Sequence, residues 1–181
     1  MHEAALSAWE SFYVIVGSSG GALIGLQFVV ITLIADRKDV GSPGALSAFG
    51  TPTVVHFAAA LTISAIMSAP WPSLRGPALL MALCGFAGLI YVAVVMRRAR
   101  RQTEYKPVIE DWIWYLIFPA VSYGALLIAG VMMARGRAAM LYEIAAVALA
   151  LLLIGVHNAW DTVTHIAITG IGKSAPDRPQ A

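Results

Sequence analysis

The chain has 181 residues, of which 59% are hydrophobic and only 12% are charged. Its mean hydropathy is +0.76. Soluble domains carry about twice this share of charged residues, so the composition excludes an ordinary water-soluble globular protein and also a disordered chain. It indicates a polytopic membrane protein.

Stretches without charged residues predict where the chain crosses the membrane, because a charge within the hydrocarbon is costly. A helix needs about 20 apolar residues to cross ~30 Å of hydrocarbon. The sequence predicts five transmembrane helices, at about 10–35, 52–69, 76–96, 112–134 and 139–168. We expect them to form one all-α membrane domain over 1–172, followed by a short polar tail over 173–181.

The distribution of Lys and Arg between the predicted loops indicates the orientation of the chain. One side of the membrane would hold Arg37, Lys38, Arg97, Arg98, Arg100, Arg101, Lys106, Lys173 and Arg178. The other side would hold only Arg75, Arg135 and Arg137. Because cytoplasmic loops carry the excess of positive charge, we expect the N-terminus outside and the C-terminus in the cytoplasm, in a bacterial inner (plasma) membrane.

The 10–35 segment carries a repeat of small residues. Gly17, Gly21 and Gly25 recur every four residues, and such residues let two helix backbones approach closely in lipid. The contact is either with another helix of the same chain or with a second subunit. Gln27 lies about 200° around the helix from Gly25, and a lone amide in hydrocarbon needs a partner. A helix covered on two faces favours a homo-oligomer.

The 139–168 segment holds the richest polar cluster. His157, Asp161 and His165 stand at i, i+4 and i+8, which places them on one helix face, and Asn158 flanks them. We expect His157 and Asp161 to form a protonatable pair. The alternative is a structural ion pair in the headgroup region, with His165 exposed on an extension of the helix.

The 52–69 segment presents a stripe of small and polar residues. Within a sector of about 80° at 100° per residue lie Thr53, His56, Ala60, Ser64 and Met67. With a rise of 1.5 Å per residue, His56, Gln27 and His157 fall at a similar depth on the cytoplasmic side. Polar groups from several helices are therefore expected to converge on one level.

These features lead to a channel or facilitator for a small ion or proton as the main functional hypothesis. The path would be formed by Gln27, His56, Ser64, His157, Asn158, Asp161 and His165. In this interpretation His157 and Asp161 control passage, and His56 is the polar group that faces them.

Two other functions stay open at this point. A redox or metal-binding protein would use His56, His157 and Asp161 as ligands, or the two histidines on a haem. We expect no cofactor, with a haem or a transition metal as the alternative. A structural accessory subunit of a larger membrane complex is the third hypothesis. Enzyme activity is not expected, because no serine has an evident acid or base partner.

The basic cluster Arg97, Arg98, Arg100 and Arg101 adjoins a predicted helix end. It is interpreted as an orientation anchor, with an anionic-lipid site as the alternative. A net charge of +2 gives no support for nucleic-acid binding.

Pro119 lies inside the 112–134 segment and is expected to kink it, because proline lacks a backbone donor and clashes with the preceding turn.

Overall fold

The computed structural model describes residues 6–35, 43–101 and 109–173, and for 33–35, 43–50, 99, 101, 111 and 165–173 it describes the backbone alone. Over the described residues the chain is helical and has no strand. Five of its helices are long and apolar enough to cross a membrane. The prediction of an all-α chain with five helices of transmembrane length is therefore confirmed.

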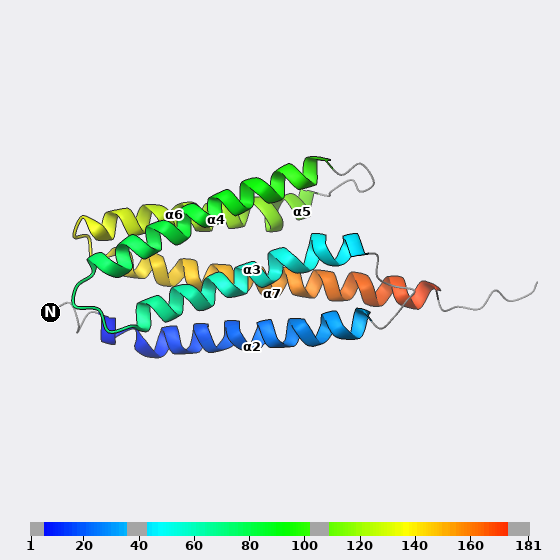
Figure 1. Ribbon diagram of the computed structural model, residues 1–181, viewed down its shortest axis with the longest axis horizontal. Coiled ribbons are helices and arrows are strands. Elements are labelled where there is room, and N and C mark those ends of the chain that lie inside the picture. Colours follow the sequence, from blue (N-terminus) through cyan, green and yellow to red (C-terminus); the bar gives the residue numbers. More distant parts are fainter. Residues whose placement is uncertain (1–5, 36–42, 102–108, 174–181) are drawn as a thin grey trace, which may run out of the picture.

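The helices run up and down along one axis (Figure 1). In chain order they are α2 (Glu10–Ala35), α3 (Pro43–Ser68), α4 (Arg75–Arg101), α5 (Ile109–Trp112), the π-helical turn η1 (Ile113–Ile117), α6 (Phe118–Ala134) and α7 (Met140–Lys173). The segments α5, η1 and α6 follow one another directly, and η1 and α6 together provide the fourth membrane-length span, Ile113–Ala134.

Three helices are longer than predicted, and one of them is α4, which ends at Arg101 rather than at about 96. Helix α3 begins at Pro43 rather than at about 52, and Pro52 lies inside it. The prediction took Pro52 as a helix start, but prolines are tolerated within membrane helices when neighbouring groups satisfy the freed backbone. Helix α7 continues to Lys173 rather than 168, since no proline follows until Pro176. Residues 174–181 of the predicted tail lie outside the described residues.

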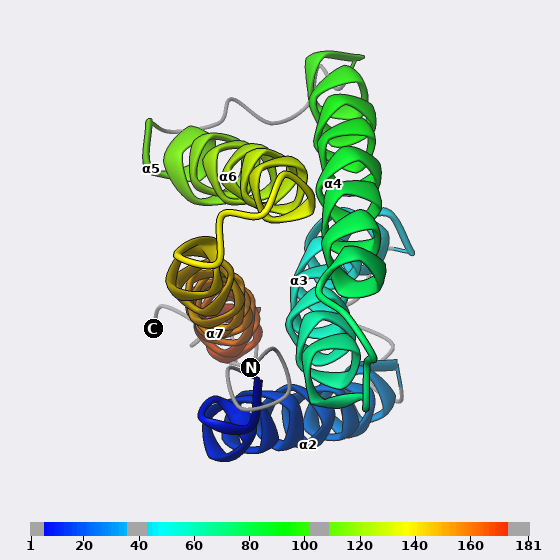
Figure 2. The ribbon, with the colours of Figure 1, turned by 90° about the vertical axis from the view of Figure 1, so that its left-hand side faces the viewer.

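Helices α3 and α7 occupy the middle of the bundle. Helix α3 packs mainly against α2 and α7, α6 packs against α7 and α4, and α3 and α4 touch only slightly (Figure 2). The bundle is therefore a chain of contacts in the order α2, α3, α7, α6, α4. Because consecutive spans are antiparallel, the C-terminal ends of α2, α4 and α7 meet the N-terminal ends of α3 and α5 at one end, on the right in Figure 1.

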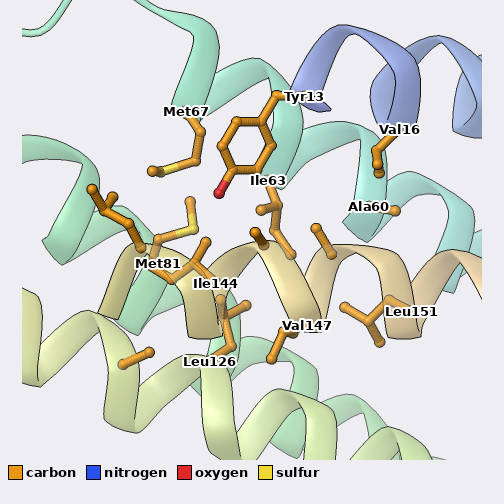
Figure 3. Packing of buried hydrophobic residues seen from close by; sticks show 14 of the residues in the cluster. Tyr13, Val16, Ala60, Ile63, Met67, Met81, Leu126, Ile144, Val147 and Leu151 are labelled. Carbon is orange, nitrogen blue, oxygen red and sulfur yellow. The ribbon is translucent and has the colours of Figure 1, made fainter. Parts of the chain in front are cut away.

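The centre of the bundle is an apolar core (Figure 3). Among its fully buried side chains are Ile63, Met67, Met81, Leu126, Ile144 and Leu151. The outer surface is also apolar, with large side chains such as Ile15, Leu79 and Val121 exposed. A chain that is apolar both inside and outside suits a lipid environment.

The closest helix contact joins α4 to α6 through glycines. A Cβ added at Gly85 would lie 2.8 Å from the carbonyl oxygen of Tyr123, and one added at Gly130 would lie 2.8 Å from that of Ala78. At Gly88 an added Cβ would overlap the ring of Tyr123. These positions admit no side chain, so the two backbones meet directly.

The glycines singled out on the first helix behave differently from one another. Gly17 packs inside the chain against Ser64 of α3, and a Cβ there would lie 2.9 Å from the Ser64 Cβ. Gly20, not Gly21, provides the next contact with α3, beside the carbonyl oxygen of Phe57. Gly21 and Gly25 are exposed, and an added Cβ would meet nothing within 4 Å. The α2–α3 contact therefore follows a spacing of three residues rather than four.

Replacing Gly88 with alanine should destabilise the fold by about 1–3 kcal/mol, the usual cost of forcing extra atoms into a packed core. The matched control is Gly124→Ala, next to Tyr123 on α6, where an added Cβ meets nothing within 4 Å. The free energy of unfolding in detergent micelles should fall for Gly88→Ala and stay unchanged for Gly124→Ala. Equal stability of the two variants would contradict the close α4–α6 packing.

Candidate functional site

His56 on α3 lies among three helices and is 1% exposed. Its Nδ1 atom shares a hydrogen bond of 3.0 Å with the hydroxyl of Tyr123 on α6. The edge of the ring of Tyr91 on α4 faces the imidazole, with ring centroids 6.5 Å apart. His56 therefore connects α3 to α6 and α4 across the part of the bundle where α3 and α4 otherwise touch little.

The predicted stripe on α3 faces the interior of the bundle. All five of its members are buried, namely Thr53, His56, Ala60, Ser64 and Met67. The angular spacing read from the sequence thus places them correctly on one face. Close packing surrounds them, since Gly17 lies against Ser64 and Gly155 of α7 lies against the Phe57 ring.

Asn158 on α7 is fully buried. Neither its Oδ1 nor its Nδ2 has a hydrogen-bond partner among the described residues. Gly155, about one turn earlier, packs on Phe57, so Asn158 lies level with the turn of the antiparallel α3 that holds Thr53. A buried amide without partners is costly, which marks this position as one where a polar group is retained for a reason other than packing.

Gln27 on α2 is also buried. It follows Gly20, which packs beside Phe57, by two helical turns, so it approaches the level of Thr53. Its burial and the exposure of Gly25 agree with the predicted angle between them. We call Gln27, Thr53, His56, Tyr123 and Asn158 the interior polar group; all five are buried, and His56 and Tyr123 are joined directly.

The two residues expected to form a protonatable pair have other partners. The half-buried ring of His157 stacks on Trp114, with centroids 3.7 Å apart and planes 13° apart. Its Nδ1 atom has no hydrogen-bond partner among the described residues. Asp161 is exposed, and its Oδ2 atom accepts a long hydrogen bond of 3.4 Å from the Tyr115 hydroxyl.

We call Trp114, Tyr115, His157 and Asp161 the α6–α7 group. It lies on the side of α7 that faces the fourth span, whereas Asn158 is buried. The side chain of His165 lies outside the described residues. The polar residues thus form two groups rather than one layer, and the His56–Tyr123 pair lies near the middle of its helices.

The π turn η1 carries the aromatic residues of the α6–α7 group. The Phe118 N–H donates to the carbonyl oxygen of Ile113, five residues earlier. Pro119 follows directly and cannot donate a hydrogen bond, so the regular α-helical pattern is interrupted just before it. The disturbance predicted at Pro119 therefore takes the form of a π turn. The extra residue in this turn shifts Trp114 and Tyr115 around the helix relative to a regular α-helix, where they meet α7.

The ligand set predicted for a metal is not assembled. Among the described side chains, no group of three or more His, Cys, Asp or Glu lies close enough together to hold a metal ion. His56 is engaged by Tyr123, while His157 is covered by Trp114. His56, His157 and Asp161 therefore do not form one site in this conformation.

Sequence reasoning gave Tyr123 no role. A tyrosine in the middle of an apolar span, far from the interfacial positions that tyrosines prefer, is the signal that would have identified it. The His157–Trp114 stack has no such signal, because it depends on the π turn.

Comparisons with protein-family models, with curated proteins and with solved structures find no match for this chain.

Removing the Tyr123 hydroxyl should leave the His56 Nδ1 atom buried without a partner. Tyr123→Phe is therefore expected to lower the free energy of unfolding by about 1–3 kcal/mol. The double variant His56→Leu/Tyr123→Phe removes both polar groups and should recover much of this loss. Denaturation in detergent measures both effects. If the stability loss of the double variant equals the sum of the losses of His56→Leu and Tyr123→Phe, the hydrogen bond is not formed.

Proposed function

We propose that the protein is an integral membrane channel or facilitator for a small ion or proton, acting as a homo-oligomer. The observation that carries this proposal is the interior polar group. A buried histidine, its tyrosine partner and an asparagine amide without a partner among the described residues lie within a bundle whose core and surface are mostly apolar. Polar groups are expensive in a membrane protein, and an ionisable residue there generally serves a substrate or ion pathway.

In this proposal the interior polar group forms the entrance of the path, and the apolar core acts as its gate. Beyond His56 the buried side chains include Ile63, Met67 and Leu126, which offer no hydrogen bond to a passing ion. Hydrophobic constrictions of this kind close a pathway by excluding water. Passage requires this constriction to hydrate, so the conformation described here is closed.

His157 and Asp161 are proposed to lie at the mouth of the path. In this position the two side chains would control entry, and Asp161 is exposed. His165, four residues after Asp161, belongs to the same proposed mouth by its position in α7.

The homo-oligomer is proposed from the free face of α2. Gly21 and Gly25 are exposed and have open space around them, so a helix of a second copy can approach closely there. Native mass spectrometry of the purified protein in detergent tests this part of the proposal. A single-chain mass as the sole species would contradict it.

The proposed location is a bacterial inner membrane, with the N-terminus outside and the C-terminus in the cytoplasm. Arg97, Arg98 and Arg100 are exposed near the C-terminal end of α4, where they would meet anionic lipid headgroups of the cytoplasmic leaflet. Arg101 follows them in sequence, with its backbone alone described.

The orientation predicts the behaviour of reporter fusions. Alkaline phosphatase needs disulfides that form outside the cytoplasm. A fusion at the C-terminus should therefore be inactive, whereas one placed after Gly136, in the exposed turn between α6 and α7, should be active. The reverse pattern of activity would overturn the orientation.

Liposomes that contain the purified protein should pass protons or one of Na⁺, K⁺ and Cl⁻ faster than empty liposomes. His56→Leu should lower this flux several-fold, because the polar entrance is lost. His157→Ala and Asp161→Ala should alter the flux and its pH dependence. The matched control is Glu143→Ala, an exposed carboxylate near the opposite end of α7, which should leave the flux unchanged.

Wild-type liposomes that pass none of these ions above the empty control would end the proposal. That outcome would favour an accessory subunit, in which the same polar groups serve contact with a partner.

A further inference from the structure

Outside the interior polar group, two buried hydroxyls have no hydrogen-bond partner among the described residues. Tyr13 on α2 is 1% exposed and Ser64 on α3 is 2% exposed. Neither the Tyr13 hydroxyl nor the Ser64 Oγ atom has a hydrogen-bond partner among the described residues. In Figure 3 the ring of Tyr13 reaches from α2 into the apolar core, with its hydroxyl directed inward.

These hydroxyls make the fold less stable than it would be without them. Moving an unpaired hydroxyl from water into an apolar core costs free energy of desolvation, and no new hydrogen bond offsets that cost. Phenylalanine at 13 and alanine at 64 would keep most of the packing and avoid this cost. Packing therefore does not explain either hydroxyl.

The buried polar atoms extend along most of the length of the bundle. Thr53 stands ten residues after Pro43, where α3 begins, and Asn158 lies at about its level. His56 and Tyr123 follow, then Ser64. Gly17 packs against Ser64, so Tyr13, one turn earlier on the antiparallel α2, lies level with Met67. Tyr13 is itself three residues from Glu10, where the first span begins.

We infer that the transported ion is the proton, and that it crosses along the interior side of α3 by way of Asn158, His56, Tyr123, Ser64 and Tyr13, with water molecules between them. This inference rests on the proposed transport function and specifies its substrate. The longest interval separates His56 from Ser64, about 12 Å along α3 at 1.5 Å per residue.

The chemistry of these groups suits a proton and not a metal ion. Hydroxyl and imidazole groups both donate and accept hydrogen bonds, so each takes up a proton on one lone pair and releases another from the same side chain. One proton is thereby moved, which leaves the hydroxyl reoriented and the imidazole in its other tautomer, and each group must turn back before it carries the next proton. A metal ion needs several oxygen ligands in place of its hydration shell. Between His56 and Ser64 the only member of the stripe is Ala60, which has no polar side-chain atom. In the proposed route, water molecules beside Ala60 connect the two polar side chains.

The test uses hydroxyl deletions that the fold does not need. Tyr13→Phe and Ser64→Ala remove unpartnered groups, so both variants should fold and unfold at wild-type temperatures or above. Proton flux into liposomes, followed with an enclosed pH-sensitive dye under a K⁺ diffusion potential, should fall at least fivefold in each. The matched controls are Tyr142→Phe and Ser18→Ala, whose side chains are exposed, and their flux should equal the wild type.

Each outcome separates this inference from the broader proposal. Proton flux that is unchanged in Tyr13→Phe and Ser64→Ala overturns the proposed route and leaves transport in place. Wild-type flux of Na⁺, K⁺ or Cl⁻ without protons overturns the proton as substrate but supports a facilitator. No flux of any ion overturns both.

Discussion

The hydrogen bond between His56 and Tyr123 shows the constraint that governs this molecule. In a bundle that is apolar on both its inside and its outside, a buried polar side chain cannot form hydrogen bonds with bulk water and needs a partner within the chain. His56 meets this requirement with a hydroxyl from a helix far away in sequence. Asn158, Ser64 and Tyr13 find no such partner in the part of the chain that the structure describes. The contrast between satisfied and unsatisfied groups, rather than the mere presence of polar residues, marks where this fold departs from what packing alone requires.

The positions of the helices could largely be predicted from the sequence, because charged residues are costly in hydrocarbon and uncharged stretches along the chain therefore mark the spans. The pattern of residues gave five spans and placed the α3 stripe on a single face. Their ends were less predictable: Pro52 looked like a helix start, yet the backbone remains helical back to Pro43. Which helices pack together could not be predicted. The sequence pointed to a close contact through Gly17, Gly21 and Gly25, whereas the closest contact joins α4 to α6 through Gly85, Gly88 and Gly130. Which helices become neighbours depends on tertiary packing that no local spacing encodes.

The candidate site was likewise predictable only in part from the sequence. Position along a helix follows from counting residues, but the polar residues were expected at one level, whereas His56 bonds to Tyr123 near the middle of the helices. The direction in which each side chain points depends on the neighbouring helices, and here the expectation differed from the structure. His157 turns to Trp114, and the adjacent Asn158 is the residue that is buried completely. The π turn before Pro119 sets the position of Trp114. A proline in the sequence predicts that the helix is disturbed, but not whether the disturbance is a kink or a π turn.

The glycine contact between α4 and α6 has a mechanical consequence. At Gly85 and Gly130 the two backbones touch, and at Gly88 the ring of Tyr123 fills the space beside the glycine. Helix α3 contacts α4 only slightly, but its His56 bonds to the hydroxyl of the same Tyr123. One tyrosine therefore packs on α4 through its ring and bonds α3 through its hydroxyl. A movement of α4 against α6 would displace the hydrogen-bond partner of the buried histidine.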